Sequence, residues 1–175
     1  MGTRLEAGLY YIGDPCYLIV HSDEGMKAWG EFCDEFNNKE NNTSQALVKL
    51  PWGTFWVANT YDGDGAYPLV DREGKALKHL PVDAGLISVI PIQKLDLTKS
   101  FWTWDTIDQF PKEPKEPTYF AGGCVVIMRD SFVCDEHEGT IHIKGGSQDY
   151  RVLTNRYDED EEEDYDEYEE DDDDE

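Results

Sequence analysis

Three short segments place aspartate beside glycine where the backbone must turn tightly: Gly13–Cys16, Asp62–Gly65 and Asp83–Gly85. A carboxylate in such a turn either caps nearby backbone amides or joins other carboxylates around a cation or a polar ligand. Both interpretations remain open at the level of sequence. The candidate ligand-binding residues are Asp14, Cys16, Asp62, Asp64 and Asp83.

Other patterns that carry metal or catalytic chemistry are incomplete. The Asp62–Gly65 segment has part of a calcium loop, but the third acidic ligand and the distal glutamate are missing. The Cys134–His137 segment has zinc-ligand residue types, yet this single C-x-x-H fragment lacks the second ligand pair of a structural zinc site. Cys16 has no basic neighbour that would activate it as a nucleophile. The sequence therefore predicts no metal and no cofactor, and it favours a binding protein over an enzyme.

The segments Tyr11–Tyr17, Tyr61–Gly65 and Val82–Gly85 read YIGDPCY, YDGDG and VDAG. In this order, with a tryptophan-containing helix after the first, they resemble the motifs of a family of small uncharacterised proteins of bacteria and their phages. The resemblance covers Leu9 to Pro91 and implies a compact α+β domain. It implies no reaction and no functional residue, and the acidic C-terminus lies outside the shared pattern.

Hydrophobic periodicity predicts the elements that must position these turns. Spacings of three and four in residues 21–42 predict one amphipathic helix, capped by Ser22 or Asp23, whose apolar face is formed by Met26, Trp29, Phe32, Cys33 and Phe36. Alternating or β-branched runs predict two strands within 8–20, interrupted by a turn or bulge at 13–15, a strand run at 81–97 kinked at 83–85 and at Pro91, and strands at 122–128 and 139–143. They also predict a hairpin at 46–58 with its turn at 51–53. Loops are expected at 61–68, 71–75 and 112–117. The predicted fold class is α+β, with a mainly antiparallel, bent β-sheet and one principal amphipathic helix.

The formal charge of −24 is concentrated in one segment. Of the 18 residues Asp158 to Glu175, all but Tyr165 and Tyr168 are acidic, which gives −16 and leaves −8 for residues 1–157. Residues 1–157 are predicted to form a single domain, and residues 158–175 a disordered polyacidic tail. A protein that coats nucleic acid needs a Lys/Arg surface, so the composition disfavours direct nucleic-acid binding.

The aromatic residues Trp52, Phe55, Trp56, Phe101, Trp102 and Trp104 could stack on bases, but the negative charge assigns them to the core or to a protein-facing patch. Four scattered cysteines predict reduced, mostly buried thiols and no disulfide framework. The N-terminus lacks the apolar region of a signal peptide, and no apolar run could span a bilayer. We expect a cytoplasmic protein without a membrane partner, in the host cytoplasm if it is phage-encoded.

The tail can act as an electrostatic copy of a nucleic-acid strand. If extended at about 3.3 Å per residue it spans about 60 Å, and its charges lie about 4 Å apart, close to the ~3.4 Å between phosphates of one strand. We predict a non-enzymatic, phage-type binding protein that engages or inhibits a basic, nucleic-acid-binding host or defence protein, with the tail as polyanion mimic. The candidate partner-binding residues are Tyr157, Glu161, Glu162, Glu163, Asp164, Tyr165, Asp166, Tyr168, Asp171 and Asp172.

Two other functions remain open. In the first, the domain binds or converts a small molecule or nucleotide at the Asp/Gly turns, and the tail only keeps the protein in solution. In the second, the protein binds single-stranded nucleic acid and its acidic tail is self-inhibitory. This alternative requires a basic groove on the domain.

Overall fold

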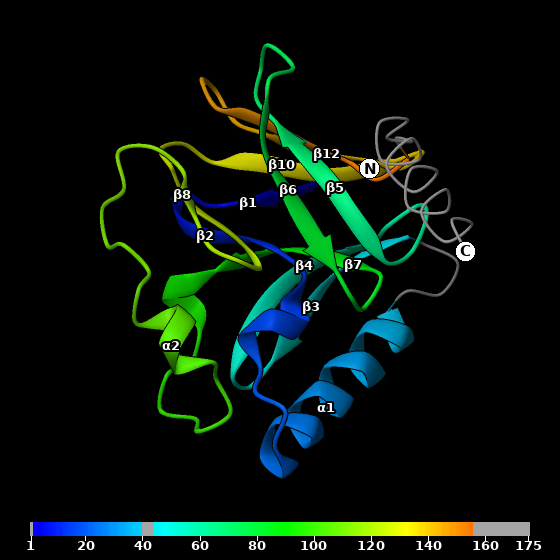
Figure 1. Cartoon of the computed structure of the whole chain (residues 1–175), viewed down its shortest axis with the longest axis vertical. Helices are drawn as coiled ribbons and strands as arrows, with labels where there is room; N and C mark the ends of the chain where they lie inside the picture. The colour runs from blue at the N-terminus through cyan, green and yellow to red at the C-terminus, as the bar shows by residue number, and fades with distance from the viewer. Residues whose placement is uncertain (1, 40–43, 156–175) are drawn as a thin grey trace, which may run out of the picture.

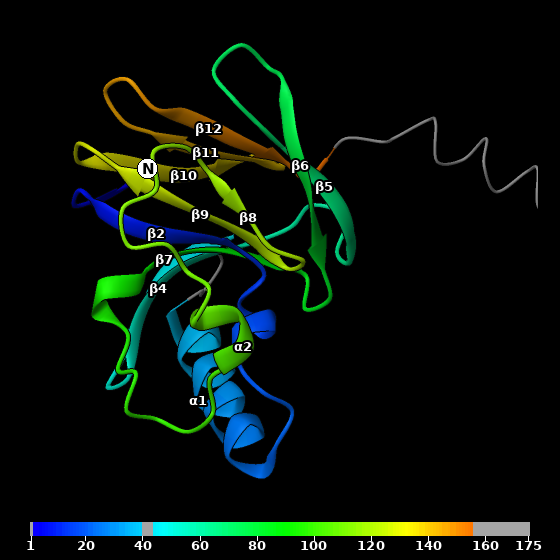
Figure 2. The same cartoon turned by 60° about the vertical axis from the view of Figure 1, so that its left-hand side comes forward.

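The computed structural model describes residues 2–39 and 44–155, and the predicted tail lies outside them. In this part of the chain two six-stranded antiparallel sheets are stacked, and α1 (Asp23–Lys39) covers the outer side of the second sheet (Figure 1, Figure 2). The α+β fold with a mainly antiparallel, bent sheet and one principal amphipathic helix is therefore confirmed. The strands are, however, divided between two sheets.

The first sheet has the strand order β1-β10-β11-β12-β5-β6. Its strands are β1 (Thr3–Leu5), β5 (Gly65–Val70), β6 (Ala76–Val82), β10 (Phe132–His137), β11 (Thr140–Lys144) and β12 (Asp149–Leu153). The second sheet has the order β3-β4-β7-β2-β9-β8. Its strands are β2 (Gly8–Gly13), β3 (Gln45–Leu50), β4 (Gly53–Asn59), β7 (Leu86–Pro91), β8 (Thr118–Tyr119) and β9 (Gly123–Met128). The connections contain the short helices η1 (Pro15–Leu18), η2 (Ile92–Lys94) and α2 (Trp104–Ile107).

The second sheet is buried on both faces. Tyr10 and Trp56 point into the core between the two sheets, whereas Tyr11 and Phe55, one residue along each strand, point into a second core beneath α1. This alternation follows from the two-residue period of a strand. Burial on both faces explains why the strands of this sheet are nearly continuous apolar runs, as in β7, where all six residues are buried.

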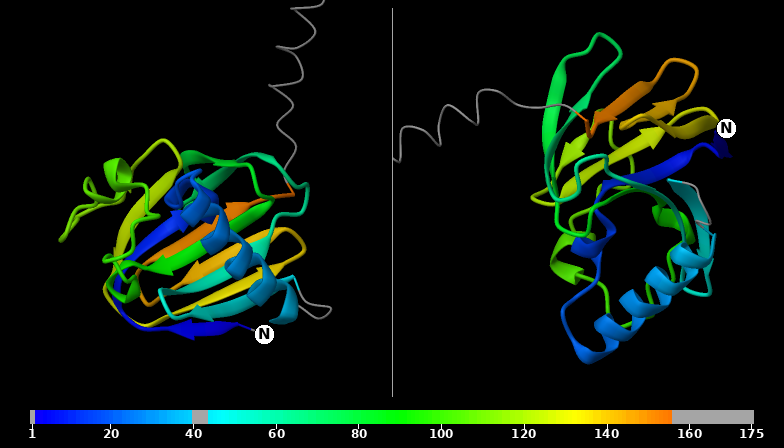
Figure 3. Two further views of the ribbon diagram at one scale, coloured as in Figure 1. Left: turned by 90° about the horizontal axis from the view of Figure 1, so that it is seen from below. Right: turned by 90° about the vertical axis from the view of Figure 1, so that its right-hand side faces the viewer.

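The helix α1 begins where predicted and lies across the strands of the second sheet (Figure 3). The hydroxyl of Ser22 accepts a hydrogen bond from the Gly25 amide at 3.1 Å, which confirms Ser22 as the capping residue. Phe32 and Phe36 are buried against the sheet. Met26, predicted on the same apolar face, is instead 48% exposed. It lies beside η1, where the helix extends beyond the edge of the core.

Most other predicted elements are present with shifted bounds, but the β-rich run predicted after the turn at 13–15 is wrong, because Pro15–Leu18 forms the short helix η1. The hairpin turn at 51–53 joins β3 and β4, and the predicted turn at 71–75 joins β5 and β6. The loop predicted at 61–68 is shorter, because β5 already begins at Gly65. The tryptophan and phenylalanine side chains assigned to the core are buried, apart from Trp104, which is 37% exposed. All four cysteines are free; Cys124 and Cys134 are buried, and Cys16 and Cys33 are half-buried. Across residues 2–39 and 44–155, no helix has the length and apolar character needed to cross a membrane.

Candidate functional site

The fully buried carboxylate of Asp14 joins the first Asp/Gly turn to the third. Its Oδ1 accepts a hydrogen bond from the Cys16 amide at 3.0 Å, which shapes the start of η1. Its Oδ2 accepts from the amides of Asp83 and Ala84 at 2.9 and 2.7 Å. Three backbone donors thus share one buried carboxylate. Asp14 acts as a clamp between two segments that are about 70 residues apart in sequence.

Strand pairing brings these two turns together. Gly13 at the end of β2 is paired with Ser88 of β7, and the Ser88 hydroxyl donates to the Gly13 carbonyl at 2.6 Å. On the outer side the Tyr17 hydroxyl donates to Asp83 Oδ2 at 2.6 Å. Burial and the Asp83 carboxylate raise the pKa of Tyr17 well above its ordinary value, so the phenol remains the proton donor.

The second Asp/Gly turn packs against the third. The Thr60 amide donates to the Gly85 carbonyl at 3.0 Å, and the Tyr67 hydroxyl donates to the Gly63 carbonyl at 2.9 Å. A Cβ atom placed on Gly85 would lie 3.9 Å from Asp64 Oδ1, which shows how closely the two turns approach. Burial raises the pKa of the Tyr67 phenol, and the negative charges of Asp62 and Asp64 act in the same direction.

The three turns therefore converge, but their aspartates have different roles. The carboxylate of Asp14 is buried and holds backbone amides, as the capping interpretation predicted. Asp62, Asp64 and Asp83 are exposed. Burial, followed by the charge of Asp14, raises the pKa of Cys16 far above its ordinary value, so this thiol is a poor nucleophile. No cluster of three or more His, Cys, Asp or Glu side chains able to hold a metal occurs among the described residues.

The chain leaves the described fold beside these exposed aspartates. The Thr154 hydroxyl donates to the Gly139 carbonyl at 2.7 Å and accepts from the Tyr61 amide at 3.0 Å. Asn155, the last described residue before the acidic tail, donates through its side chain to the Glu138 carbonyl at 2.7 Å. The turn between β10 and β11 is therefore fixed beside the turn that begins at Tyr61.

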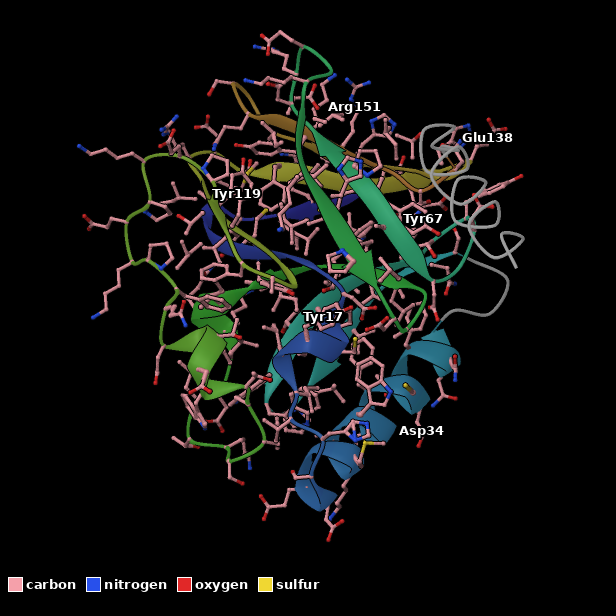
Figure 4. All side chains as sticks on the ribbon, in the orientation of Figure 1. Tyr17, Asp34, Tyr67, Tyr119, Glu138 and Arg151 are labelled. Atoms are coloured by element: carbon pink, nitrogen blue, oxygen red, sulfur yellow. The ribbon has the colours of Figure 1, made fainter. Side chains whose placement is uncertain are left out.

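We call the exposed carboxylates of Asp62, Asp64, Asp83 and Glu138 the acidic corner. In Figure 4, Tyr67 and Glu138 are labelled on the side of the molecule where these turns lie, and Tyr17 is labelled on η1 above α1. Tyr61, which precedes Asp62, is 68% exposed and adds a large aromatic surface to the corner. In the sequence, the acidic segment Asp158–Glu175 begins three residues after Asn155.

Several residues that build this site had no distinctive sequence signal. Glu138 and Thr154 were not among the candidates, since their roles depend on the pairing of β10, β11 and β12. Glu138 has a φ of 50°, an uncommon value for a non-glycine residue, in the tight turn that it forms with Gly139. The predicted partner-binding residues, from Tyr157 to Asp172, lie outside the described residues.

Comparison with known proteins adds no relative. No family model, curated protein or solved structure matches the chain. The resemblance to small bacterial and phage proteins remains a prediction that rests on the three Asp/Gly segments, and the basis for a functional proposal is the geometry of the acidic corner.

Proposed function

We propose that this protein is a non-enzymatic binding protein that engages a basic, nucleic-acid-binding protein, with the acidic tail as a polyanion mimic. The acidic corner at the start of the tail is the observation that carries the proposal. It extends the negative surface from the tail onto folded, fixed positions of the domain. A partner can then contact the tail and a rigid surface at the same time.

The rigid surface is needed for selectivity. A polyanionic segment gives fast, salt-sensitive association with many cationic proteins but discriminates poorly between them. The turns that carry the acidic corner are fixed by hydrogen bonds: the Asp83 and Ala84 amides donate to Asp14, the Tyr61 amide donates to Thr154, and the Thr60 hydroxyl donates to the Gly85 carbonyl.

The setting follows from the resemblance to proteins of phages and bacteria. A phage-type protein of this kind acts in the host cytoplasm on a nucleic-acid enzyme or a defence protein, and it inhibits the target by occupying the groove that holds nucleic acid. The proposal needs no reaction. Asp14 is already saturated by three amides, which leaves the competing small-ligand hypothesis without its buried carboxylate.

Pull-down from lysate tests the proposal with two kinds of variant. Deletion of residues 158–175 should strongly reduce capture of basic nucleic-acid-binding proteins. The triple change Asp62→Asn, Asp64→Asn and Glu138→Gln should reduce capture less and should alter which proteins are retained. A matched control removes three exposed charges near α2, by Asp105→Asn, Asp108→Asn and Glu113→Gln, and should leave capture unchanged. Equal capture by the intact and the deleted protein would refute the polyanion mechanism.

A further inference from the structure

A hollow of about 110 Å³ lies between η1 and the first turns of α1. We propose that this hollow, called here the α1 hollow, receives an aliphatic side chain from a positively charged segment of a partner protein. This inference rests on the proposed function and names the contact that selects the partner. The side chains that line the hollow are those of Cys16, Ile19, Val20, His21, Met26 and Trp29.

The lining is apolar and accessible. Met26 is 48% exposed, and Trp29 and Cys16 are half-buried beside it. A methionine at the edge of an apolar depression can adapt its shape to an incoming side chain, which is how methionine-rich surfaces bind varied partners. Apolar surface that remains exposed around a depression is typical of a protein-interaction site.

The size of the hollow limits what it can hold. A closed apolar cavity of about 150 Å³ can accept benzene. The α1 hollow, at about 110 Å³, is smaller and open on one side, so a leucine or methionine side chain fits better than an aromatic ring or a drug-sized ligand. We therefore infer a peptide side chain as the occupant.

The charged residues of α1 nearest the hollow are Asp23, Glu24 and Lys27, two acids and one base, which leave a net charge of −1 that favours a cationic segment. Asp23 lies three residues before Met26 on α1, and Asp34, labelled in Figure 4, is exposed further along the helix. On the opposite side, Asp83 is held by Tyr17, the neighbour of Cys16. None of the described residues that line the hollow is lysine or arginine. A second copy of this chain, with its charge of −24, would be repelled from the same surface.

One residue of the acidic corner lies next to the hollow. The Asp83 carboxylate accepts from Tyr17, the neighbour of Cys16, and, after burial and the charge of Asp14, its charge raises the pKa of the Cys16 thiol that lines the hollow. A basic segment can thus place one aliphatic residue in the hollow while its lysines or arginines face Asp83 and the rest of the acidic corner. The apolar contact would set the register, and the charges would accelerate association.

Two fluorescein-labelled peptides test the inference by anisotropy at 50 mM and 150 mM salt. Both peptides have 12 residues and the same number of lysines, and they differ only in a central leucine or alanine. Burial of leucine in the hollow should make the leucine peptide bind about tenfold more tightly to the intact protein than the alanine peptide. The methyl resonance of Met26 should shift with the leucine peptide, while that of the buried Met128 should not.

Two variants that add the same charge test whether the difference in affinity between the leucine and alanine peptides arises at the α1 hollow. Met26→Glu should reduce the tenfold preference for leucine to less than twofold, although its added negative charge favours cationic peptides. Leu97→Glu adds the same charge at another exposed apolar residue, 41% exposed, and should retain the preference. If Met26→Glu does not fold, as judged by circular dichroism, Met26→Gln replaces it.

Each outcome is decisive. Equal affinity of the two peptides for the intact protein, with strong weakening by salt, would overturn the α1 hollow as a docking site and leave the proposed function in place. A preference for leucine that persists in Met26→Glu would also overturn it. Failure of both peptides to bind at 50 mM salt would contradict the hollow and the proposed function together.

Discussion

The replacement Asp14→Asn should show that this aspartate is a structural clamp. The buried carboxylate accepts hydrogen bonds from the amides of Cys16, Asp83 and Ala84 at 2.7–3.0 Å. Asparagine has the same shape but only one acceptor atom and two new donors. One of the three amides must therefore face an NH2 group, and the other two lose a charged acceptor.

The magnitude follows from these three bonds. A hydrogen bond to a charged group contributes about 1.5–3 kcal/mol, and a buried donor left without an acceptor costs about 1–3 kcal/mol. In its best orientation the asparagine oxygen faces Asp83 and Ala84, which leaves the Cys16 amide without an acceptor. We expect the free energy of unfolding to fall by about 2–3 kcal/mol, and by about 4 kcal/mol in Asp14→Ala, where all three donors are stranded.

Urea unfolding followed by tryptophan fluorescence gives this free energy, and amide hydrogen exchange locates the change. Exchange at Asp83 and Ala84 should accelerate more than exchange in the centre of β7, because the clamp holds the turn before that strand. As a control, Asp96→Asn removes a carboxylate whose Oδ1 accepts from the amide and hydroxyl of Thr98, within an exposed turn. The free energy of unfolding of Asp96→Asn should be close to that of the wild type. If Asp14→Asn were as stable as Asp96→Asn, the clamp would be refuted.

Four further substitutions test local features of the fold. Gly25→Ala should destabilise the protein by about 1–3 kcal/mol, because the new Cβ would lie 1.8 Å from the Val20 carbonyl oxygen. In the same helix, a Cβ on Gly30 meets nothing within 4 Å, so Gly30→Ala should stabilise the protein by up to about 1 kcal/mol. Thermal unfolding compares the two variants. Glu138→Asn should stabilise the protein by up to about 1 kcal/mol in the same assay, because asparagine tolerates a φ of 50° better, and a loss of stability would contradict this account. Burial raises the pKa of the Cys124 thiol from 9.0 to about 12. Between these pH values the thiol is deprotonated in the unfolded chain but protonated in the native protein, so the free energy of unfolding falls as pH rises. In urea titrations between pH 9 and 11, the free energy of unfolding of Cys124→Ala should fall less steeply than that of the wild type, by about 1 kcal/mol per pH unit. An unchanged pH dependence would exclude the Cys124 thiol as the cause of the fall.

Local patterns predicted the elements that depend on neighbours in sequence. The helix α1 follows from the spacing of Phe32 and Phe36 and from the Ser22 cap, all within one segment. The β3–β4 hairpin follows from its short turn. The division into two sheets could not be predicted in this way, because β5 is paired with β12, about 80 residues later in the chain. The burial of the second sheet on both faces also blurs the alternation that marks a strand with one open face.

The sequence predicted residues of the candidate site but not how they contact one another. The Asp/Gly composition indicated tight turns with capping or ligand-binding aspartates, and it identified Asp14 and Asp83. That the Asp14 carboxylate holds the Asp83 amide depends on the pairing of Gly13 with Ser88, which no local pattern specifies. The contribution of Thr154 was not predictable either, since a lone threonine hydroxyl has no signal before the end of β12 is placed beside Tyr61.

The position of Asp83 in the acidic corner depends on the role of Asp14 as a buried clamp. If Asp14 were a ligand-binding residue, a ligand would compete with the Asp83 and Ala84 amides for its carboxylate, and the turn at Asp83 would lose its anchor whenever the ligand bound. Because Asp14 is saturated by backbone amides, Asp83 keeps its position whether or not a partner is bound. Binding at the corner then requires little ordering of the domain, which leaves more of the interaction energy for affinity. On the proposed function, a polyanionic segment gains selectivity only when it is joined to such a preorganised surface, so loss of the Asp14 clamp should weaken discrimination between cationic partners more than it weakens their overall attraction.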